Sequence, residues 1–592
     1  MPIFTYPELP LDGLLRRAAV RDPAGCAVRS GHDATTFAEL DMRADRYAAY
    51  LERTVGRRGA RIGVANVLGA EFAAAYYGIV RSGNTVVLLN PLIREAALLH
   101  VCSQAAVELA FVPTATAEVL AKRGDGLPAL RHVVVTDAPD MVVPADALPL
   151  EAALDSLPPD TAGAAGLGAG PADLDADACI QFTTGTTGRP KGVRLTHRNL
   201  VANAAQTAAA HGLGSDSVTL NHLPLYHTMH LNSAVYAGAC QVLCPDPDPT
   251  AALGLAALTG TTHFYGLPAR LHRLAAEFRF AGHEQGHEQG HEQGHEQGHE
   301  QGQDRGREEG REPGQDRGRE EGREPGQDRG REEGREPGRE PGPAPLPVTD
   351  RLTAVLSGGT ALAPADARLL RERLRVPVVQ GYGMAELSPL THSQSPTADA
   401  RTGSVGTAVP GTECRIVHLE TREPLDVYAT GEVQVRGPQL MAGYLGESGH
   451  PAGADGWFST ADVGYLNRDG ELFLVDRLGD VFKYDNELVS PTAVEGVVTA
   501  DPRVAECVVV GWPDPVHGSV VWLGVVLRDP DAAGLLDVLD SIVEDANERL
   551  APHEQIRRVE VLDAVPRTPV GKPDRRLLRR DIRNRAAAEA AV

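Results

Sequence analysis

The chain has 592 residues, enough for several domains with large cores, and a formal net charge of −23. A chain this acidic argues against a nucleic-acid partner bound through its phosphates. Among the seven cysteines only Cys240 and Cys244 lie close together, which argues against a zinc site made of two such pairs and favours a reduced, cytoplasmic enzyme.

The N-terminal residues have no basic start followed by an apolar run, so we expect no signal peptide, and no apolar run approaches the length of a membrane span. Helical and strand-like patterns then alternate up to about residue 175, with helices expected at 40–55 and 70–82 and strands at 60–65 and 85–89. This alternation predicts a largely parallel sheet with helices on its faces. A stretch rich in glycine, alanine and aspartate at 162–177 indicates a surface linker.

Residues 180–200, IQFTTGTTGRPKGVRLTHRNL, form the most informative stretch of the chain. Its glycines permit tight turns, and the exposed N–H groups of such a loop can cradle phosphate oxygens beside the positive charge of Lys191. Apolar residues before the loop predict a strand, and Thr196 is placed to cap a helix that runs to Gly212. A strand, a Gly/Thr loop and a helix predict a nucleotide phosphate site, although the spacing is not that of a Walker A loop.

Strands are expected next at 218–226, 239–243 and 262–265, followed by a helix from Pro268 to Phe278. Residues 283–302 are then five copies of His-Glu-Gln-Gly, and 303–338 are three copies of QDRGREEGREPG. This insert, at about 282–345, carries no side chains that could build a core, so we expect disorder and assign it no catalytic role. Its histidines could bind a metal opportunistically, but a tolerated repeat expansion is the simpler interpretation.

Regular patterns resume at Leu352, where LTAVLSGG, a helix from Pro364 and VPVVQG predict a β-α-β unit whose strand ends collect ligands. Residues 403–436 indicate a small β-rich part. Beyond residue 476, strands at 506–510, 520–527 and 557–562 with a helix at 534–550 predict a small α+β domain.

These motifs together resemble the adenylate-forming superfamily, which contains acyl-CoA synthetases, the adenylation domains of peptide synthetases and firefly-type luciferases. The resemblance covers nearly the whole chain except the insert, and it implies an α/β fold. A large multi-sheet N-terminal domain with parallel sheets would occupy 1–476, and a small mobile α+β C-terminal lid domain 477–592. The implied reaction is ATP-dependent activation of a carboxylic acid as acyl-AMP, followed by transfer to CoA.

The resemblance also implies residue roles. Tyr382 of QGYGMAELSPL would stack on adenine, and Glu386 would hold Mg²⁺ near the phosphates. Asp462 of GWFSTADVGYL would accept hydrogen bonds from the ribose hydroxyls, with Arg477 reaching ribose or phosphate; read alone, Asp462 could equally be a helix cap. Lys572 of PRTPVGKPDRR would bridge the carboxylate and the α-phosphate during adenylation, although a solvated basic tail is the alternative.

The full set of residues implied in ATP or AMP binding is Thr183, Thr184, Gly185, Thr186, Thr187, Gly188, Lys191, Gly358, Gly359, Gln380, Gly381, Tyr382, Gly383, Glu386, Asp462, Arg477 and Lys572. Of these, Lys191 and Lys572 are implied to be catalytic, and Thr187 and Glu386 to ligate the metal. Only four lysines occur in the chain, and three of them (Lys191, Lys483 and Lys572) fall in such motifs, which indicates selection for a compact ammonium there.

LPLYHTMHLNS, at 223–233, resembles the corresponding stretch of 4-coumarate-CoA ligases, which favours an aromatic or arylpropenoic acid. His227 would then be a catalytic residue between the acyl pocket and the nucleotide, although a histidine read alone is more often structural. The pocket residues implied by the resemblance are His227, Met229, Ser233, Gly358 and Ser388.

Three positions depart from the family pattern. Ala385 stands where threonine is usual, which removes one hydroxyl contact to phosphate. In the hinge and CoA segment, which also contains Lys483, Gly479 replaces a charged hinge residue, and Asn486 replaces a glycine that lines the pantetheine tunnel. Asn486 keeps a second hypothesis open, namely adenylation followed by carrier-protein loading, amide formation, or ATP- and nitrite-dependent diazotisation of an aromatic amine. A third hypothesis, a catalytically dead binding protein, conflicts with retention of Lys191, Glu386 and Lys572.

Overall fold

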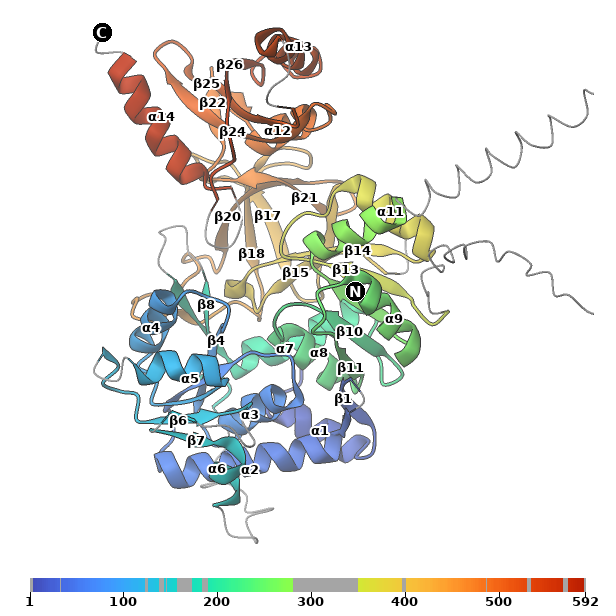
Figure 1. Ribbon diagram of the computed structural model, residues 1–592, viewed down its shortest axis with the longest axis vertical. Coiled ribbons are helices and arrows are strands. Elements are labelled where there is room, and N and C mark those ends of the chain that lie inside the picture. Colours follow the sequence, from blue (N-terminus) through green and yellow to red (C-terminus); the bar gives the residue numbers. More distant parts are fainter. Residues whose placement is uncertain are drawn as a thin grey trace, which may run out of the picture.

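The computed structural model describes the chain except for residues 1–3, 32, 123–125, 138–142, 145, 157–172, 184–189, 280–349, 397–400, 486, 530–533, 568–572 and 590–592. The predicted repeat insert therefore lies outside the described residues. Within them, the strands form three sheets. Figure 1 shows the first sheet with α2–α6 in the lower part of the molecule and the C-terminal elements at the top.

The first sheet has the strand order β19-β9-β8-β4-β3-β5-β6-β7 and is parallel from β8 to β7. Its strands are β3 (Arg61–Ala65), β4 (Thr85–Leu89), β5 (Leu109–Val112), β6 (His132–Val135), β7 (Ala147–Pro149), β8 (Asp177–Thr183), β9 (Lys191–Thr196) and β19 (Gly443–Tyr444). The helices of this part are α1 (Gly13–Arg21), α2 (Phe37–Val55), α3 (Ala70–Arg81), α4 (Glu95–Gln104), α5 (Thr114–Ala121) and α6 (Leu150–Asp155). Every residue of β4 and β5 is buried, as expected for parallel strands covered on both faces.

The second sheet has the order β17-β18-β20-β21-β16-β15-β14-β13-β12-β10-β11-β1-β2 and is parallel from β14 to β1. Its strands are β1 (Cys26–Ser30), β2 (Asp33–Thr36), β10 (Val218–His222), β11 (Cys240–Leu243), β12 (His263–Gly266), β13 (Ala354–Ser357), β14 (Val378–Gly383), β15 (Leu390–Ser393), β16 (Ser404–Ala408), β17 (Glu413–Val417), β18 (Gly431–Arg436), β20 (Phe458–Leu466) and β21 (Glu471–Arg477). The helices are α7 (His197–His211), α8 (Thr228–Ala237), α9 (Pro249–Thr259), a helix at 268–279, α11 (Pro364–Leu374) and the 3-10 turn η3 (Ala385–Leu387).

The C-terminal sheet has cores of its own. Its strands are β22 (Phe482–Tyr484), β23 (Glu487–Val489), β24 (Val504–Asp514), β25 (Gly518–Leu527) and β26 (Ile556–Val561), and its helices are α12 (Pro491–Val498), α13 (Leu535–Asn547) and α14 (Arg575–Glu589). The predicted α/β class, with a large N-terminal domain containing parallel sheets and a small C-terminal domain, is confirmed. Helix α14 was not predicted, because its sequence contains six arginines and shows only a weak apolar pattern. Its two buried residues, Leu578 and Ile582, pack it against the rest of the C-terminal domain.

One strand was not predicted. Between the phosphate loop and the helix, Lys191–Thr196 forms β9, which folds back antiparallel on β8. Most of β9 is buried, and only Lys191 and Arg194 are partly exposed. The capping prediction is confirmed: the Thr196 side chain accepts from the amide of Asn199, and α7 ends at Gly212 with φ 69°.

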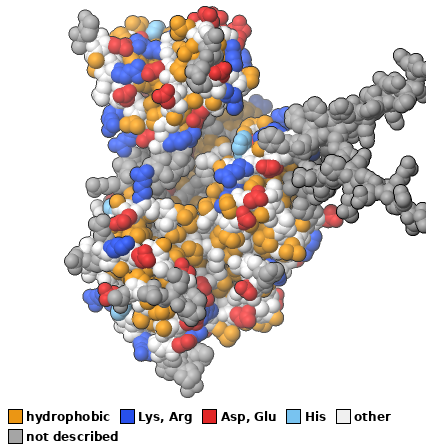
Figure 2. All heavy atoms as spheres, in the orientation of Figure 1, with side chains coloured by type: hydrophobic (Ala, Val, Ile, Leu, Met, Phe, Trp, Pro, Cys, Tyr) orange, Lys and Arg blue, Asp and Glu red, His pale blue; other side chains and the backbone are white. Residues whose placement is uncertain are grey.

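In the described part of the chain, none of the helices combines the length and the apolar character that a membrane crossing requires. On the face shown in Figure 2, acidic and basic side chains are interspersed over both the upper and the lower parts of the molecule. This surface is therefore mixed in sign even though the net charge of the chain is −23.

Candidate active site

The parallel strands β12, β13 and β14 end together at one edge of the second sheet, the place where ligands collect in open α/β sheets. The chain leaves β13 through Gly358 and Gly359, both predicted site residues. A Cβ added at Gly358 would lie 3.6 Å from the carbonyl oxygen of Gly381, and one at Gly359 would meet nothing within 4 Å. Gly359 also has φ +90°, which disfavours any other residue. This edge therefore has room for a ligand against the backbone.

Three predicted nucleotide residues meet beside this edge. Tyr382 on β14 donates its hydroxyl to Asp462 Oδ2 at 2.5 Å, and Arg477 Nε lies 2.7 Å from Asp462 Oδ1. Asp462 on β20 and Arg477 on β21 are paired in register. The pairing of the two strands therefore brings the carboxylate and the guanidinium together. Asp462 lies inside a strand, which excludes the helix-cap alternative.

The Asp462 carboxylate is almost fully buried, with 7% of its side chain exposed, while 54% of Arg477 is exposed. Burial is the main cause that raises the pKa of Tyr382, and the adjacent Asp462 raises it further, so the phenol keeps its proton and acts as a donor. The preceding residue, Ala461, has φ 59°, a left-handed conformation that costs a non-glycine residue free energy. The backbone is thus held in a strained conformation directly beside the buried carboxylate.

A second group lies around Tyr444 of β19. The ammonium of Lys191 lies 4.7 Å from the centroid of the Tyr444 ring, and the Tyr444 hydroxyl donates to Glu386 Oε1 at 2.9 Å. Lys191 also forms an ion pair of 3.0 Å with Glu447. The structure therefore brings the two predicted residues Lys191 and Glu386 to one aromatic side chain that was not predicted.

Tyr444 was missed because nothing in its own sequence context marks it. It reaches the site through pairing of β19 with β9, where Tyr444 faces Val193 across about 250 residues of chain. The pattern Gly-Tyr in a two-residue strand carries no signal of that pairing. Only knowledge of the sheet order would have identified it.

Three of the predicted acyl-pocket residues, His227, Met229 and Ser233, lie at the start of α8 or within it. His227 is its N-cap, and its Nδ1 accepts from the amide of Met229 at 3.3 Å, so a neutral ring carries its proton on Nε2. Burial lowers the pKa of His227 to about 4, so the ring is neutral at pH 7. Met229 is partly exposed, whereas Ser233 is fully buried and its hydroxyl donates to the carbonyl of His230 at 3.3 Å.

Other predicted residues are already engaged by the protein. Gln380 Oε1 accepts from the amide of Leu362 at 3.0 Å, which ties β14 to the segment after β13. A Cβ at Gly383 would lie 2.0 Å from the carbonyl oxygen of Pro389, so only glycine fits there. Ser388 is 3% exposed and donates its hydroxyl to the carbonyl oxygen of Gln439 at 2.8 Å.

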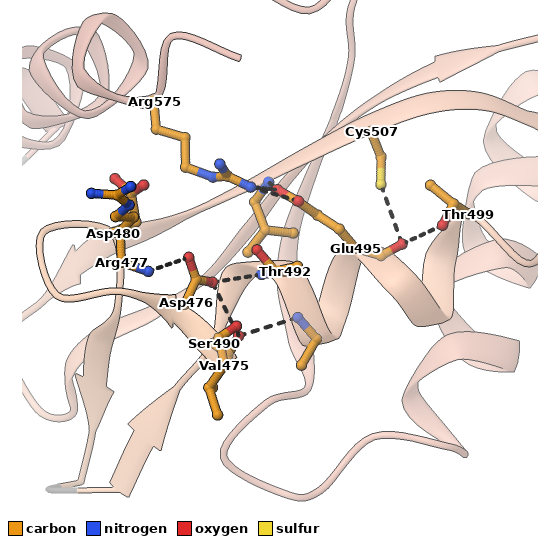
Figure 3. Close-up of polar contacts among 12 residues, drawn as sticks. Val475, Asp476, Arg477, Asp480, Ser490, Thr492, Glu495, Thr499, Cys507 and Arg575 are labelled. Carbon is orange, nitrogen blue, oxygen red and sulfur yellow. Dashed lines mark hydrogen bonds and ion pairs between the residues drawn. The ribbon is translucent and has the colours of Figure 1, made fainter. Parts of the chain in front are cut away.

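The predicted hinge is held by side chains from both sides. Asp476 accepts from the hydroxyl of Ser490 at 3.0 Å and from the amide of Thr492 at 2.9 Å, at the start of α12 (Figure 3). Next to it, Arg575 of α14 forms an ion pair of 2.6 Å with Glu495 of α12. Burial raises the pKa of Glu495, and the charge of Arg575 lowers it. The pKa is raised overall, so the effect of desolvation on this carboxyl is larger than the effect of the ion pair.

Two further hinge contacts involve predicted residues. Arg579 of α14 donates to the carbonyl oxygen of Gly479 and lies 2.7 Å from Asp480. Lys483 of β22 forms an ion pair of 2.5 Å with Glu420, which belongs to the segment after β17. Gly479 itself is unhindered, because an added Cβ would meet nothing within 4 Å.

The remaining predicted residues cannot be placed. Thr183 ends β8 opposite Lys191, but the loop beyond it, Thr184 to Gly188, lies outside the described residues. Asn486 and Lys572 lie outside them as well. Among the described residues there is no group of three or more histidine, cysteine, aspartate or glutamate side chains that could hold a metal. A metal at Glu386 would be shared with the phosphates of a ligand, which is a typical arrangement for Mg²⁺.

Comparison with known proteins places this geometry in context. A family model described as AMP-binding enzyme matches residues 15–445, and one described as AMP-binding enzyme C-terminal domain matches residues 493–572. 4-Coumarate–CoA ligase 2 of Oryza sativa subsp. japonica is 28% identical over 596 residues, covering 97% of this chain and 91% of the relative. The salicyl-AMP ligase / salicyl-S-ArCP synthetase of Mycobacterium tuberculosis (strain ATCC 25618 / H37Rv) is 27% identical, covering 97% and 90%.

The fold is also that of solved structures. The crystal structure of the anthranilate CoA ligase AuaEII in complex with anthranoyl-AMP superimposes with a TM-score of 0.74 at 20% identity, covering 99% of both chains.

Proposed function

The chain belongs to the AMP-binding enzymes, a family of adenylate-forming acyl- and aryl-CoA ligases, and we propose that it activates an aromatic or arylpropenoic acid with ATP and transfers the acyl group to CoA. The observation that carries the proposal is the buried carboxylate of Asp462, which lies within hydrogen-bonding distance of both Tyr382 and Arg477. A buried carboxylate beside an aromatic ring suits a nucleoside, because it can accept from both ribose hydroxyls while the ring stacks on the base.

In the proposed first half-reaction, the carboxylate of the acid attacks the α-phosphorus of ATP in line, and pyrophosphate leaves. Catalysis of this kind depends on positioning and on neutralising phosphate charge. Lys191 and the Gly/Thr loop would hold the phosphates, and Lys572 would stabilise the charge that develops between the carboxylate and the α-phosphate. Mg²⁺ held by Glu386, and by Thr187 if the loop supplies it, would neutralise further phosphate charge.

His227 would act as a neutral partner in this step. With its proton on Nε2, the ring can donate one hydrogen bond to the bound acid without adding charge. Gly358 and Gly359 would allow the acid and the adenine to approach the backbone closely, since neither presents a side chain.

In the second half-reaction, the C-terminal domain would rotate about residues 476–480, withdraw Lys572 and admit the thiol of CoA. Gly479, Lys483 and Asn486 would border that path. Asn486 is larger than the glycine of the family pattern and would narrow the path of CoA, which favours a different second step as the second candidate function. Loading of a carrier protein, amide formation and nitrite-dependent diazotisation all follow from the same adenylation chemistry.

The test is a mass-spectrometric product assay with ATP, Mg²⁺ and a panel of cinnamic, benzoic and fatty acids, with and without CoA, plus an arm with nitrite and aminoaryl acids. We expect an acyl-CoA product. Acyl-AMP that accumulates despite CoA, or a diazo product with nitrite, would assign the second candidate instead. Binding of AMP without pyrophosphate release from any acid would refute adenylation and leave a catalytically dead binding protein.

A further inference from the structure

Two of the seven cysteines meet in the second sheet, although they stand 214 positions apart in the chain. Sγ of Cys26, the first residue of β1, lies 2.7 Å from Sγ of Cys240, the first residue of β11, and Figure 1 shows the two strands side by side. A disulfide has an S–S bond of about 2.05 Å, so the two sulfur atoms lie less than about 1 Å beyond bonding distance. Both residues are partly exposed, which leaves the pair open to an oxidant from solvent.

The strand pairing also brings the two backbones close enough for a bond. β1 runs parallel to β11, with Val28 opposite Gln241. By this register Cys240 lies beside Ala27, one residue from Cys26. Neighbouring strands lie about 4.8 Å apart and one residue advances a strand by about 3.3 Å, so the two Cα atoms are about 6 Å apart, which is typical of a disulfide. The register of β1 on β2 shifts between Cys26 and Val28, an irregularity of the kind that re-aims a side chain.

The pair that lies close in the sequence, Cys240 and Cys244, has the wrong geometry for such a bond. These residues stand four positions apart along one extended segment, so their Cα atoms are about 13 Å apart, whereas a disulfide spans at most about 7 Å. Cys244 is buried, and its Sγ lies 3.8 Å from the carbonyl oxygen of Asp246. The partner that the fold gives to Cys240 is therefore Cys26.

The acidity of the thiols makes Cys26 the attacking group. The hydrogen bond donated by the Cys240 thiol, together with the positive charge of Arg29, lowers the pKa of Cys26 to about 7. Cys26 is therefore largely a thiolate at pH 7.5, the form that attacks disulfides. The pKa of each of the other six cysteines is raised, and burial raises it to about 12 at Cys102 and Cys414.

A bond at this position would fasten the edge of the sheet to the end of the helix that begins at His227. β1 and β2 are the last two strands on this side of the second sheet. Arg21 of α1 donates to the carbonyl oxygen of Ala237, the last residue of α8, at 2.8 Å, and the two cysteines follow these helices in the chain. A covalent link between residues so distant in the chain restricts the unfolded state and so stabilises the folded one.

We propose that Cys26 and Cys240 form a site of reversible covalent modification, an intramolecular disulfide that a small disulfide of the glutathione type generates and that locks β1 to β11. In the first step the Cys26 thiolate attacks one sulfur of the oxidant, whose S–S bond breaks, and the departing thiolate takes up a proton. In the second step Cys240 loses its proton and its sulfur attacks the Cys26 sulfur, which releases the second small thiol. Two cysteine thiols have then lost two protons and two electrons, the oxidant has been reduced to two thiols, and an excess of thiol reverses both steps.

The test exposes the full-length protein at pH 7.5 to a series of mixtures of reduced and oxidised glutathione. After an acid quench the remaining thiols are blocked, and peptides are identified by mass spectrometry. We expect Cys26 and Cys240 to be oxidised together with one midpoint, as a cross-link between their two peptides, and to return to thiols in excess reduced glutathione. The other five cysteines should stay reduced. In the reduced protein, iodoacetamide should alkylate Cys26 at least about 10-fold faster than Cys102.

Variants and thermal unfolding separate the bond from its effect. Cys26→Ser and Cys240→Ser should each lack the cross-link, whereas the matched control Cys244→Ala, which removes the nearest thiol in the sequence, should keep it. The oxidised wild type should unfold about 5 °C above the reduced wild type, because the bond closes a long loop of the unfolded chain. Cys26→Ser should unfold at the same temperature under both conditions.

Each adverse result removes a different part of the proposal. Thiols that stay free at the oxidising end of the series, glutathione attached to either cysteine without a cross-link, or a bond between Cys240 and Cys244 would overturn the site. A cross-link that excess reduced glutathione leaves intact would overturn its reversibility, and one that leaves the unfolding temperature unchanged would overturn the lock. None of these readouts uses acid activation, so failure of the proposed function is a separate result.

Discussion

Substitution of Asp462 by asparagine probes the nucleotide site at its most buried carboxylate. The side chain is 7% exposed, and its carboxylate accepts from the Tyr382 hydroxyl at 2.5 Å and lies 2.7 Å from Arg477 Nε. Asparagine keeps the shape and can keep one oxygen toward Arg477. Its NH₂ group then faces Tyr382, so one acceptor and the negative charge are lost.

The expected loss of affinity follows from these contacts. A hydrogen bond to a charged group contributes about 1.5–3 kcal/mol and a neutral one about 0.5–1.5 kcal/mol, so neutralising the acceptor of two ribose hydroxyls costs about 3 kcal/mol. Since about 1.4 kcal/mol corresponds to a factor of ten, AMP should bind about 100-fold more weakly. The resting protein already shares this carboxylate with Tyr382 and Arg477, which makes the figure an upper estimate.

Isothermal titration calorimetry with AMP measures this loss directly, and circular dichroism checks that the variant is folded. Asp366→Asn is a matched control, because Asp366 on α11 is equally buried at 4% side-chain exposure and also has two partners, His272 at 2.7 Å and Arg279 at 2.9 Å. That control should lose stability but keep its affinity for AMP. A folded Asp462→Asn that binds AMP as tightly as the wild type would refute the assignment of Asp462 to the ribose.

Lys572→Ala should abolish acyl-AMP formation while AMP still binds. The control Lys122→Ala, at an exposed lysine, should change neither acyl-AMP formation nor AMP binding. Pyrophosphate release at the wild-type rate from Lys572→Ala would contradict the catalytic role. Glu495→Ala should lower the free energy of unfolding of the C-terminal domain by about 3 kcal/mol, because it leaves the Arg575 guanidinium without its ion pair and the amide of Val509 without its acceptor. AMP affinity should not change, and an unaltered denaturation midpoint would show that these contacts contribute nothing. Burial lowers the pKa of His392 to about 3, so the folded protein stays neutral there while the unfolded chain takes up a proton below pH 6.5. Stability should therefore fall as pH drops from about 6.5 towards 3, and His392→Gln should flatten the dependence of Tm on pH in that window; an unchanged slope would exclude this histidine as a cause.

The sequence predicted the family, the α/β class and the residues that meet at Asp462, because the motifs are local and each ends or lies on a strand. The capping of α7 by Thr196 and its end at Gly212 were predictable for the same reason. The hairpin of β8 and β9 was not, since a short strand after a loop resembles the start of a helix until its pairing is known.

Site residues that depend on pairing between strands far apart in the sequence could not be predicted. Tyr444 joins Lys191 and Glu386 only because β19 pairs with β9. The roles proposed for Lys572, Asn486 and the Gly/Thr loop remain predictions, since these residues lie outside the described part of the chain.

The contacts around the hinge bear on how the proposed rotation is made possible. Glycine at position 479 has wide backbone freedom, yet its carbonyl oxygen accepts a hydrogen bond from Arg579 of α14. The Lys483–Glu420 ion pair joins β22 to the N-terminal domain, and its side chains are 39% and 68% exposed, so solvent screens the pair and it opposes rotation only weakly. The Asp476 contacts to Ser490 and Thr492 are ordinary hydrogen bonds that water can replace once the hinge opens. The polar contacts across the hinge are weak and would break easily. The buried Arg575–Glu495 ion pair keeps α14 and α12 together, so the C-terminal domain would turn as one body.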